Sequence, residues 1–224
     1  MGADSPLAKH PEKSPVLDDE NLAKGLRILA RRDKSMARAI RFAGPLPDRS
    51  LPRGFATLAK IIVEQQLSLA AAAAIWSRLE ADLGEVTPAG VLSRDVPHLK
   101  ALGLGARKAE YVHGIATALL SNDLDLPAMC RMTDLDAIAH LTAVRGVGPW
   151  TAEVYLLFAE GRSDIFPAGD IALQAAAQWA FDLPTRPDTE SFRIMADAWR
   201  PWRGAAARLL WHVYRRLKEE KKSG

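Results

Sequence analysis

A short glycine-bracketed motif occurs twice in this sequence and limits the folds that the chain can adopt. Residues 103–110 read GLGARKAE and residues 146–153 read GVGPWTAE, so the glycines, the alanine and the glutamate recur in register. Glycine at these positions permits a sharp turn with φ > 0 and close packing of the backbone. Apolar residues recur at helical spacing around each copy, which predicts two helix–turn–helix units packed in one helical subdomain.

The second copy carries the features that indicate a binding function. Pro149 follows Gly148 where a helix would start, and proline is favoured in the first helical turn. The bare N–H groups at such a helix N-terminus suit a phosphate oxygen. Asp170 stands twenty residues after Trp150, directly before the apolar run IALQAAAQWAF. An aspartate in this place is commonly a helix N-cap, and a catalytic carboxylate is the alternative interpretation.

The second copy and the loop after it resemble the helix-hairpin-helix (HhH-GPD) superfamily of DNA glycosylases. In that superfamily a hairpin ending Gly-hydrophobic-Gly precedes a Gly/Pro-rich loop with the catalytic aspartate. GPWTA (148–152) followed by FPAGD (166–170) looks like the 3-methyladenine DNA glycosylase II branch. Further matching segments are IIVEQQLSL (61–69), GLGARKAEY (103–111) and WRPWRGAAARLLW (199–211). The resemblance covers about residues 20–218.

The helical pattern, with no β-strand pattern along the chain, predicts an all-α fold. The resemblance implies two helical subdomains with the active-site cleft between them. The expected parts are a disordered tail (1–18), a glycosylase module (19–218) and a charged tail (219–224). Within the module, the central subdomain comprises about residues 50–150, and the other is built from about 19–45 and 151–218. The N-terminal β domain of larger bacterial members has no counterpart here, because the helical pattern starts almost at once.

Apolar periodicity and helix-stop residues predict where the helices lie. The expected ranges are 21–42 (one helix or two), 55–66, 68–83, 135–144, the stretch after Asp170 to about 181, a helix from about 189, and a last helix from Pro201 to about 218. We expect Trp76, Leu79, Trp179 and Trp202 in the core. Thr133 is expected to cap the helix over 135–144.

Composition narrows the class of protein. No apolar run is long enough to span a bilayer, and the N-terminus lacks the apolar region of a secretory signal, so we expect a cytoplasmic protein. Cys130 is the single cysteine, which excludes a four-cysteine iron–sulfur cluster, and the scattered histidines argue against zinc. From Arg193 onward Lys and Arg outnumber Asp and Glu. This excess is either a solvated helix or a phosphate-facing patch.

The family resemblance assigns chemical roles to particular residues. Asp170 is the expected catalytic residue, because a fixed carboxylate stabilises the positive charge that builds on deoxyribose and orients or deprotonates the attacking water. The extruded base would stack on electron-rich rings. The expected base-pocket residues are Trp150, Val154, Tyr155 and Trp211. Bifunctional relatives place a lysine nucleophile where this chain has Trp150, so we expect no lyase activity.

Contacts with DNA are expected from both glycine turns and from the turn at Gln66. By resemblance this turn enters the minor groove, where Gln66 fills the space left by the extruded nucleotide; an exposed turn is the plain alternative. The expected DNA-binding residues are Gln65, Gln66, Leu67, Ser68, Arg107, Lys108, Arg145, Gly146, Val147, Gly148, Thr151 and Arg203. The resemblance also implies a Na⁺ or K⁺ ion on the backbone carbonyls of Thr142, Val144 and Val147, and no required cofactor.

The expected function is therefore that of a monofunctional DNA glycosylase of base excision repair. It would act as a monomer on double-stranded DNA, away from membranes, release 3-methyladenine and 7-methylguanine, and leave an abasic site. Two alternatives stay open: a non-catalytic helix-hairpin-helix DNA-binding protein, and a same-fold glycosylase for other damaged bases. The sequence does not fix which further lesions are removed, because that depends on the shape of the pocket.

Overall fold

The protein, seen in a computed structural model that describes residues 15–223, is all-α, which confirms the predicted fold class. In chain order the α-helices are α1 (Asp19–Arg32), α2 (Lys34–Ala43), α3 (Phe55–Glu64), α4 (Leu69–Leu83), α5 (Pro88–Leu92), α6 (Val96–Ala101), α7 (Ala106–Leu120), α8 (Asp134–Thr142), α9 (Pro149–Phe158), α10 (Ile171–Ala180), α11 (Thr189–Ala196) and α12 (Arg203–Ser223). Short 3-10 helices lie at Pro127–Arg131 and Asp197–Trp199. No helix in the described range is long and apolar enough to cross a membrane.

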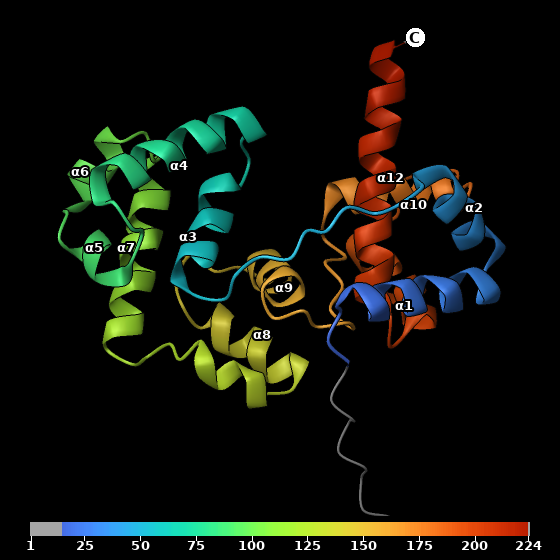
Figure 1. Ribbon diagram of the computed structural model, residues 1–224, viewed down its shortest axis with the longest axis horizontal. Coiled ribbons are helices and arrows are strands. Elements are labelled where there is room, and N and C mark those ends of the chain that lie inside the picture. Colours follow the sequence, from blue (N-terminus) through green and yellow to red (C-terminus); the bar gives the residue numbers. More distant parts are fainter. Residues whose placement is uncertain (1–14, 224) are drawn as a thin grey trace, which may run out of the picture.

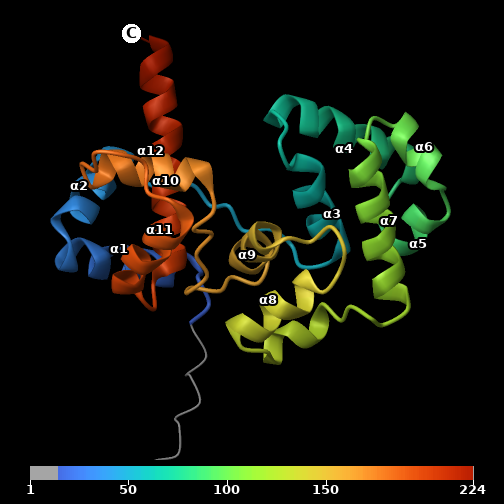
Figure 2. The ribbon, with the colours of Figure 1, turned by 180° about the vertical axis from the view of Figure 1, so that it is seen from behind.

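The helices form two lobes (Figure 1). In the first lobe α7 packs against α3, α5 and α6, and α9 packs against α3 and α8. The second lobe is built around α12, which packs against α1, α2 and α10. By these contacts α9 lies with the first lobe, beyond the boundary near residue 150 that the sequence predicted. The first linker (residues 44–54) joins α2 to α3, and the second linker (residues 159–170) joins α9 to α10; both cross between the lobes (Figure 2).

Capping residues explain where the first helices begin and end. The helical stretch predicted over 21–42 is two helices, divided at Asp33, whose carboxylate accepts N–H groups from the first turn of α2. The third helix was predicted to reach Gln66, but α3 ends at Glu64 because Gln65 leaves the helical region, with a ψ of 128°, and Gln66 follows with a φ of +55°. Thr133 is the N-cap of α8, as predicted.

The C-terminal helix is longer than predicted. α12 begins at Arg203 rather than at Pro201 and continues to Ser223. The charged tail expected over 219–224 is therefore helical through Ser223. In Figure 1 the C-terminal part of α12 extends beyond the other helices of its lobe.

The disordered tail expected over residues 1–18 lies mostly outside the described residues, and its end is corrected. Leu17 is buried, and its N–H donates to the Gly161 carbonyl at 2.6 Å. Val16 forms the only β-bridge found between residues 15 and 223, with Arg162. The start of the described chain is thus attached to the second linker.

Most of the aromatic residues predicted for the core are buried. Trp76 and Trp202 are 8% and 5% exposed, and Leu79 is 1% exposed. Trp179 is only half-buried, with its ring 4.4 Å from that of Phe42 on the surface of the second lobe.

Candidate active site

The second glycine turn joins α8 to α9 and has the geometry that its sequence predicts. Gly146 has a φ of +98°, and a Cβ atom there would lie 2.3 Å from the ring of Tyr111. Val147 is buried, and Gly148 is the N-cap of α9 without a side-chain cap. Pro149 occupies the first turn of the helix. The first N–H groups of α9 are thus left for an anion to satisfy.

Asp170 lies at the N-terminus of α10, and both oxygens of its carboxylate accept hydrogen bonds. Oδ1 accepts the N–H of Leu173 at 2.9 Å, and Oδ2 accepts the indole N–H of Trp150 at 2.8 Å. The Gln174 side chain donates to the Ala168 carbonyl at 2.8 Å and braces the preceding loop. The helix N-terminus stabilises the negative charge. The predicted N-cap role of Asp170 is confirmed, and its second oxygen is oriented from the other lobe.

A cavity of about 280 Å³ lies between the lobes. Residues from both lobes and the first linker line it, among them Leu69, Arg49, Arg208, Trp211 and His212. The ring of Phe158 lies 5.4 Å from that of Trp211, and the Arg49 guanidinium lies 5.1 Å from the Phe158 ring centre. The cavity therefore offers an aromatic wall and several cations.

Arg49 is a residue of this cavity that the sequence analysis did not identify. The linker that carries it is held on both sides: Arg208 donates to the Pro47 carbonyl at 3.1 Å, and the Leu51 N–H donates to the Phe158 carbonyl at 2.9 Å. The Arg49 side chain is exposed at the cavity; partial desolvation lowers its pKa below the ordinary value, the neighbouring Arg215 and Arg208 lower it further, and Glu64 and Asp170 partly offset them. An irregular segment has no periodicity, so the sequence holds no signal for this position.

The predicted base-pocket residues divide into two groups. Trp211 lines the cavity, and Trp150 contacts Asp170. Val154 is only 8% exposed, and Tyr155 is fully buried with its hydroxyl accepting the Gly54 N–H at 2.9 Å. Tyr155 cannot border a pocket from this place, so that assignment is corrected: it ties the start of α3 to α9.

The turn between α3 and α4 combines exposed and internally bonded residues. Gln66 and Leu67 are exposed, as insertion into a groove requires. Gln65 donates to the Thr151 hydroxyl at 2.7 Å, and Thr151 is 1% exposed. The Ser68 hydroxyl accepts an N–H in the first turn of α4. The expected phosphate contact of Thr151 is thus corrected, because its hydroxyl is buried and bonded to Gln65.

Three of the four basic residues predicted to bind DNA have partners in the protein: Arg145 pairs with Glu110 at 3.6 Å on the surface, and Lys108 and Arg203 are engaged by other groups. Arg107 is exposed, and the Arg145 side chain is 83% exposed. Lys108 instead donates to two backbone carbonyls at the end of α3, at 2.8 and 2.5 Å. Arg203 is 14% exposed and forms a bidentate pair with the buried carboxylate of Asp164. Lys108 and Arg203 are corrected to structural residues.

The carbonyls predicted to hold Na⁺ or K⁺ lie at the second glycine turn. The Val144 carbonyl accepts the N–H of Val147 at 3.1 Å, which leaves a second lone pair on that oxygen. Neutral backbone oxygens are suitable ligands for alkali-metal ions. Within the described part of the chain, no group of three or more His, Cys, Asp or Glu side chains is placed to hold a metal ion.

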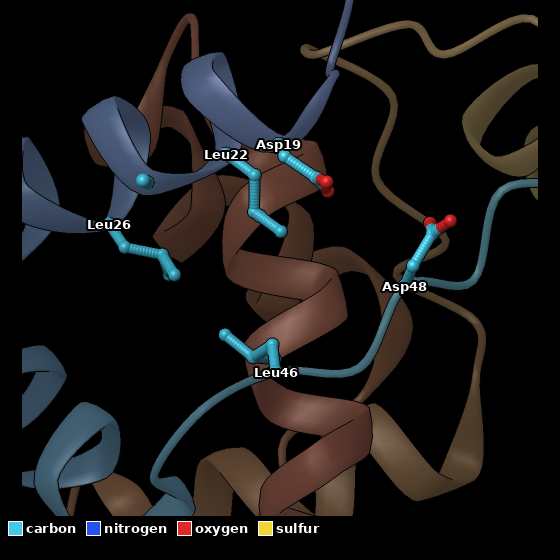
Figure 3. Close-up of a pocket in the computed structure, with 6 residues that line it drawn as sticks. Asp19, Leu22, Leu26, Leu46 and Asp48 are labelled. Carbon is cyan, nitrogen blue, oxygen red and sulfur yellow. The ribbon is translucent and has the colours of Figure 1, made fainter.

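A second cavity, of about 270 Å³, lies between α1 and the first linker (Figure 3). Leu22, Leu26 and Leu46 line its apolar part, and Asp19 and Asp48 lie at its edge. None of the predicted site residues reaches it. The cavity with Trp211 is therefore the candidate active site.

Comparison with known proteins agrees with this geometry. The family described as HhH-GPD superfamily base excision DNA repair protein matches residues 59–203. The putative DNA-3-methyladenine glycosylase YfjP of Bacillus subtilis is 32% identical over 160 residues, which are 68% of this chain and 56% of that protein. DNA-3-methyladenine glycosylase 1 of Schizosaccharomyces pombe is 29% identical over 198 residues, which are 85% of this chain and 87% of that protein. The chain thus spans just over half of the first relative and most of the second.

Solved structures give the same result. The S. pombe 3-methyladenine DNA glycosylase Mag1, in complex with abasic DNA, matches with a TM-score of 0.77 at 29% identity, over 84% of this chain and 95% of that chain. A DNA-3-methyladenine glycosidase from Bacillus halodurans matches with a TM-score of 0.76 at 31% identity, over 90% of this chain and 93% of that chain. In both cases the likeness covers most of this chain and nearly all of the other.

Proposed function

The chain belongs to the HhH-GPD superfamily of base excision DNA repair proteins, and on that premise we propose that it hydrolyses the N-glycosidic bond of alkylated bases in double-stranded DNA. The substrates are 3-methyladenine and 7-methylguanine, and the product is an abasic site. The observation that carries this proposal is the carboxylate of Asp170, which two hydrogen bonds hold at the N-terminus of α10. A DNA-binding protein without catalytic activity needs this carboxylate only as the cap of α10, and that role does not require the second hydrogen bond, from Trp150 to Oδ2.

The reaction begins with extrusion of the base, since the glycosidic bond cannot be reached inside the duplex. Cleavage of that bond builds positive charge on the deoxyribose, as in other reactions with an oxocarbenium-like transition state. Trp150 and the Leu173 N–H fix the Asp170 carboxylate before the charge appears, so little reorganisation is needed at that moment. The same carboxylate orients or deprotonates the attacking water. Trp211 offers a ring on which the base stacks.

The enzyme is proposed to be monofunctional. A glycosylase that also nicks DNA needs an amine nucleophile at the sugar, and Trp150 occupies the position of that lysine in bifunctional relatives. The amine of Lys108 is already hydrogen-bonded to the carbonyls of Val63 and Gln65 at the end of α3. Borohydride trapping of a covalent protein–DNA adduct measures the lyase step directly, and a trapped adduct would refute this part of the proposal.

DNA is proposed to lie across the N-terminus of α9, with Arg145 and Arg107 near phosphates and Gln66 and Leu67 in the minor groove. A Na⁺ or K⁺ ion on the carbonyls of the second glycine turn would add one more positive charge beside the phosphate. The protein is proposed to act as a monomer. Affinity for DNA that falls steeply with salt would support these contacts.

The decisive measurement is the release of bases from methylated duplex DNA by the wild type and by Asp170→Asn, with 3-methyladenine and 7-methylguanine resolved. We expect release by the wild type and a loss of about 100-fold or more in the variant, as for removal of an electrostatic group at the reacting centre, with DNA binding retained. If the wild type binds DNA but releases no base, the protein is a non-catalytic member of its superfamily.

A further inference from the structure

Arg49 lines the cavity beside Trp211 without a hydrogen-bond or ion-pair partner within residues 15–223. Its guanidinium lies over the face of Phe158, and this contact uses none of its five N–H donors. Arg208, which lines the same cavity, is 4% exposed, and its Nε has no acceptor. An unsatisfied buried donor costs free energy. The Arg208 Nε is enclosed, so the donors open to a ligand in this cavity are those of the exposed Arg49, for which residues 15–223 supply no acceptor.

The position of Arg49 is fixed by the chain on either side of it. Arg208 holds the Pro47 carbonyl, and the Phe158 carbonyl holds the N–H of Leu51. The Asp48 carboxylate accepts both the N–H and the hydroxyl of Ser50, which bends the linker at Arg49. A side chain on a braced turn loses less entropy on binding than one on a mobile loop. A guanidinium held in this way is suited to hydrogen bonding with one particular group of a ligand rather than to general electrostatic attraction of DNA.

The other walls of the cavity identify the group that would meet these donors. The ring of Trp211 lines the cavity and suits the flat face of a base, whereas Phe158 is 7% exposed and packs against Trp211. A phosphate has no such face, and it would be repelled by the Asp170 carboxylate, which interacts electrostatically with Arg49. A purine that stacks on the aromatic wall presents its edge, and a carbonyl oxygen on that edge is a good acceptor for a guanidinium.

We propose that Arg49 is a specificity-determining residue, which donates hydrogen bonds to a carbonyl oxygen of the extruded purine and so favours 6-oxopurine lesions over 6-aminopurine lesions. This inference rests on the proposed glycosylase function. A 6-amino group would turn a donor toward the donors of Arg49 and leave both unsatisfied. The positive charge of Arg49 also disfavours a cationic ring.

Three lesions separate the effect of the acceptor from that of the charge. Hypoxanthine is neutral with a 6-oxo group, 7-methylguanine is cationic with a 6-oxo group, and 3-methyladenine is cationic with a 6-amino group. Single-turnover release of each base from a duplex is measured for the wild type and for Arg49→Ala. The ratio of variant to wild type for each base cancels the intrinsic lability of its glycosidic bond. Only the contribution of Arg49 remains in that ratio.

We expect Arg49→Ala to slow the release of hypoxanthine and 7-methylguanine by about 10- to 100-fold, as for loss of a charged hydrogen bond, and to leave 3-methyladenine unchanged or faster. Arg49→Gln keeps N–H donors without the charge and should retain more release of both 6-oxo bases than Arg49→Ala. Arg41→Ala removes an exposed arginine of α2 outside the cavity and is the matched control. It should alter none of the three ratios.

An equal loss for all three bases overturns the proposal. If that loss comes with a smaller dependence of affinity on salt, Arg49 contacts a phosphate; if it comes with a lower melting temperature, Arg49 is structural. A wild type that releases no base refutes the glycosylase function, and the preference is then measured by binding. Duplexes with each lesion are bound by Asp170→Asn and by Asp170→Asn with Arg49→Ala. Loss of affinity for the 6-oxo lesions alone supports the inference, and equal changes overturn it.

Discussion

The two glycine turns share a backbone but differ in what their helices carry. Gly103 and Gly146 have φ values of +103° and +98°, and Gly105 and Gly148 are helix N-caps without side-chain caps. The geometry of both turns therefore follows from the positions of the glycines. The three residues between the second glycine and the Ala-Glu pair differ between the copies: they are residues 106–108 in the first and 149–151 in the second.

Those residues give the two turns different roles. Lys108 of the first copy donates to the carbonyls at the end of α3, whereas Trp150 of the second copy donates to Asp170. Glu110 is exposed and pairs with Arg145, whereas burial raises the pKa of Glu153 to about 7. The first copy is a scaffold and the second builds the site. Fold and function are thus encoded at different positions of one motif.

The largest difference in stability between the copies is expected when the positive-φ glycine of each turn is replaced by alanine. In Gly146→Ala the new Cβ meets the ring of Tyr111, and we expect a loss of about 3–5 kcal/mol in the free energy of unfolding. In Gly103→Ala the Cβ meets only the flexible end of Arg78, so about 1–2 kcal/mol is expected. Urea denaturation measures both. Equal losses would mean that the packing of the two turns is equivalent.

The second comparison replaces, one at a time, the side chains that give the two turns their different roles. Trp150→Phe removes the N–H that orients Asp170, and we expect base release to slow by about 10- to 100-fold with little change in melting temperature. Lys108→Met leaves two carbonyls of α3 without their donor, so about 1–2 kcal/mol of stability should be lost while the single-turnover rate changes little. The reverse outcome, a stability defect in Trp150→Phe and a rate defect in Lys108→Met, would refute the division into scaffold and site.

A pH-dependent effect on stability is expected for Glu153 and not for Glu110. The folded protein raises the pKa of Glu153 to about 7 from 4.5, so the folded state holds this proton more tightly than the unfolded state. Stability from this group is therefore lost as pH rises from 4.5 through 7. Glu153→Gln should gain about 1–2 kcal/mol relative to wild type at pH 8 and lose that gain near pH 4. Glu110→Gln, an exposed control, should differ from wild type by less than about 0.5 kcal/mol at either pH. Thermal unfolding at both pH values tests this pair.

The smallest effects, on the salt dependence of DNA affinity, are expected for Arg107 and Arg145, to which we assign the same role at the two turns. Arg107 and Arg145 are both exposed beside a helix N-terminus, and each is expected to contact one phosphate. Replacing either by alanine should reduce the slope of log affinity against log salt by about 0.9. Fluorescence anisotropy over a salt series measures the slope. An unchanged slope for Arg107→Ala would restrict DNA contact to the second turn.

Features that depend on the local chain were predictable from the sequence. Gly146 and Gly148 shape a turn, Pro149 begins a helix, and Asp170 caps one, because each effect acts within a few residues. The all-α class followed from helical periodicity along the whole chain. In each case the physical cause and the residue that shows it lie close together in sequence.

Partners across the fold were not predictable. Tyr155 follows the pattern of a pocket residue, yet its hydroxyl meets Gly54 from another helix end. Thr151 and Arg203 have the chemistry of phosphate ligands, but Gln65 and Asp164 already engage them. Periodicity gives the face of a helix on which a side chain lies, not the group that faces it. Motif chemistry alone therefore assigned too many residues to DNA.

The two linkers couple the relative position of the lobes to the geometry of the site. Arg49 lies on one linker and Asp170 ends the other, so the segments that would bend in any opening of the lobes are the ones that carry the reactive groups. The bond from Trp150 to Asp170 spans the lobes at 2.8 Å, and an opening of about 1 Å would take it out of hydrogen-bonding range. When the lobes open, the Asp170 carboxylate therefore loses the hydrogen bond that orients it. We therefore expect base release to be fastest in the closed arrangement, in which Trp150 orients the Asp170 carboxylate.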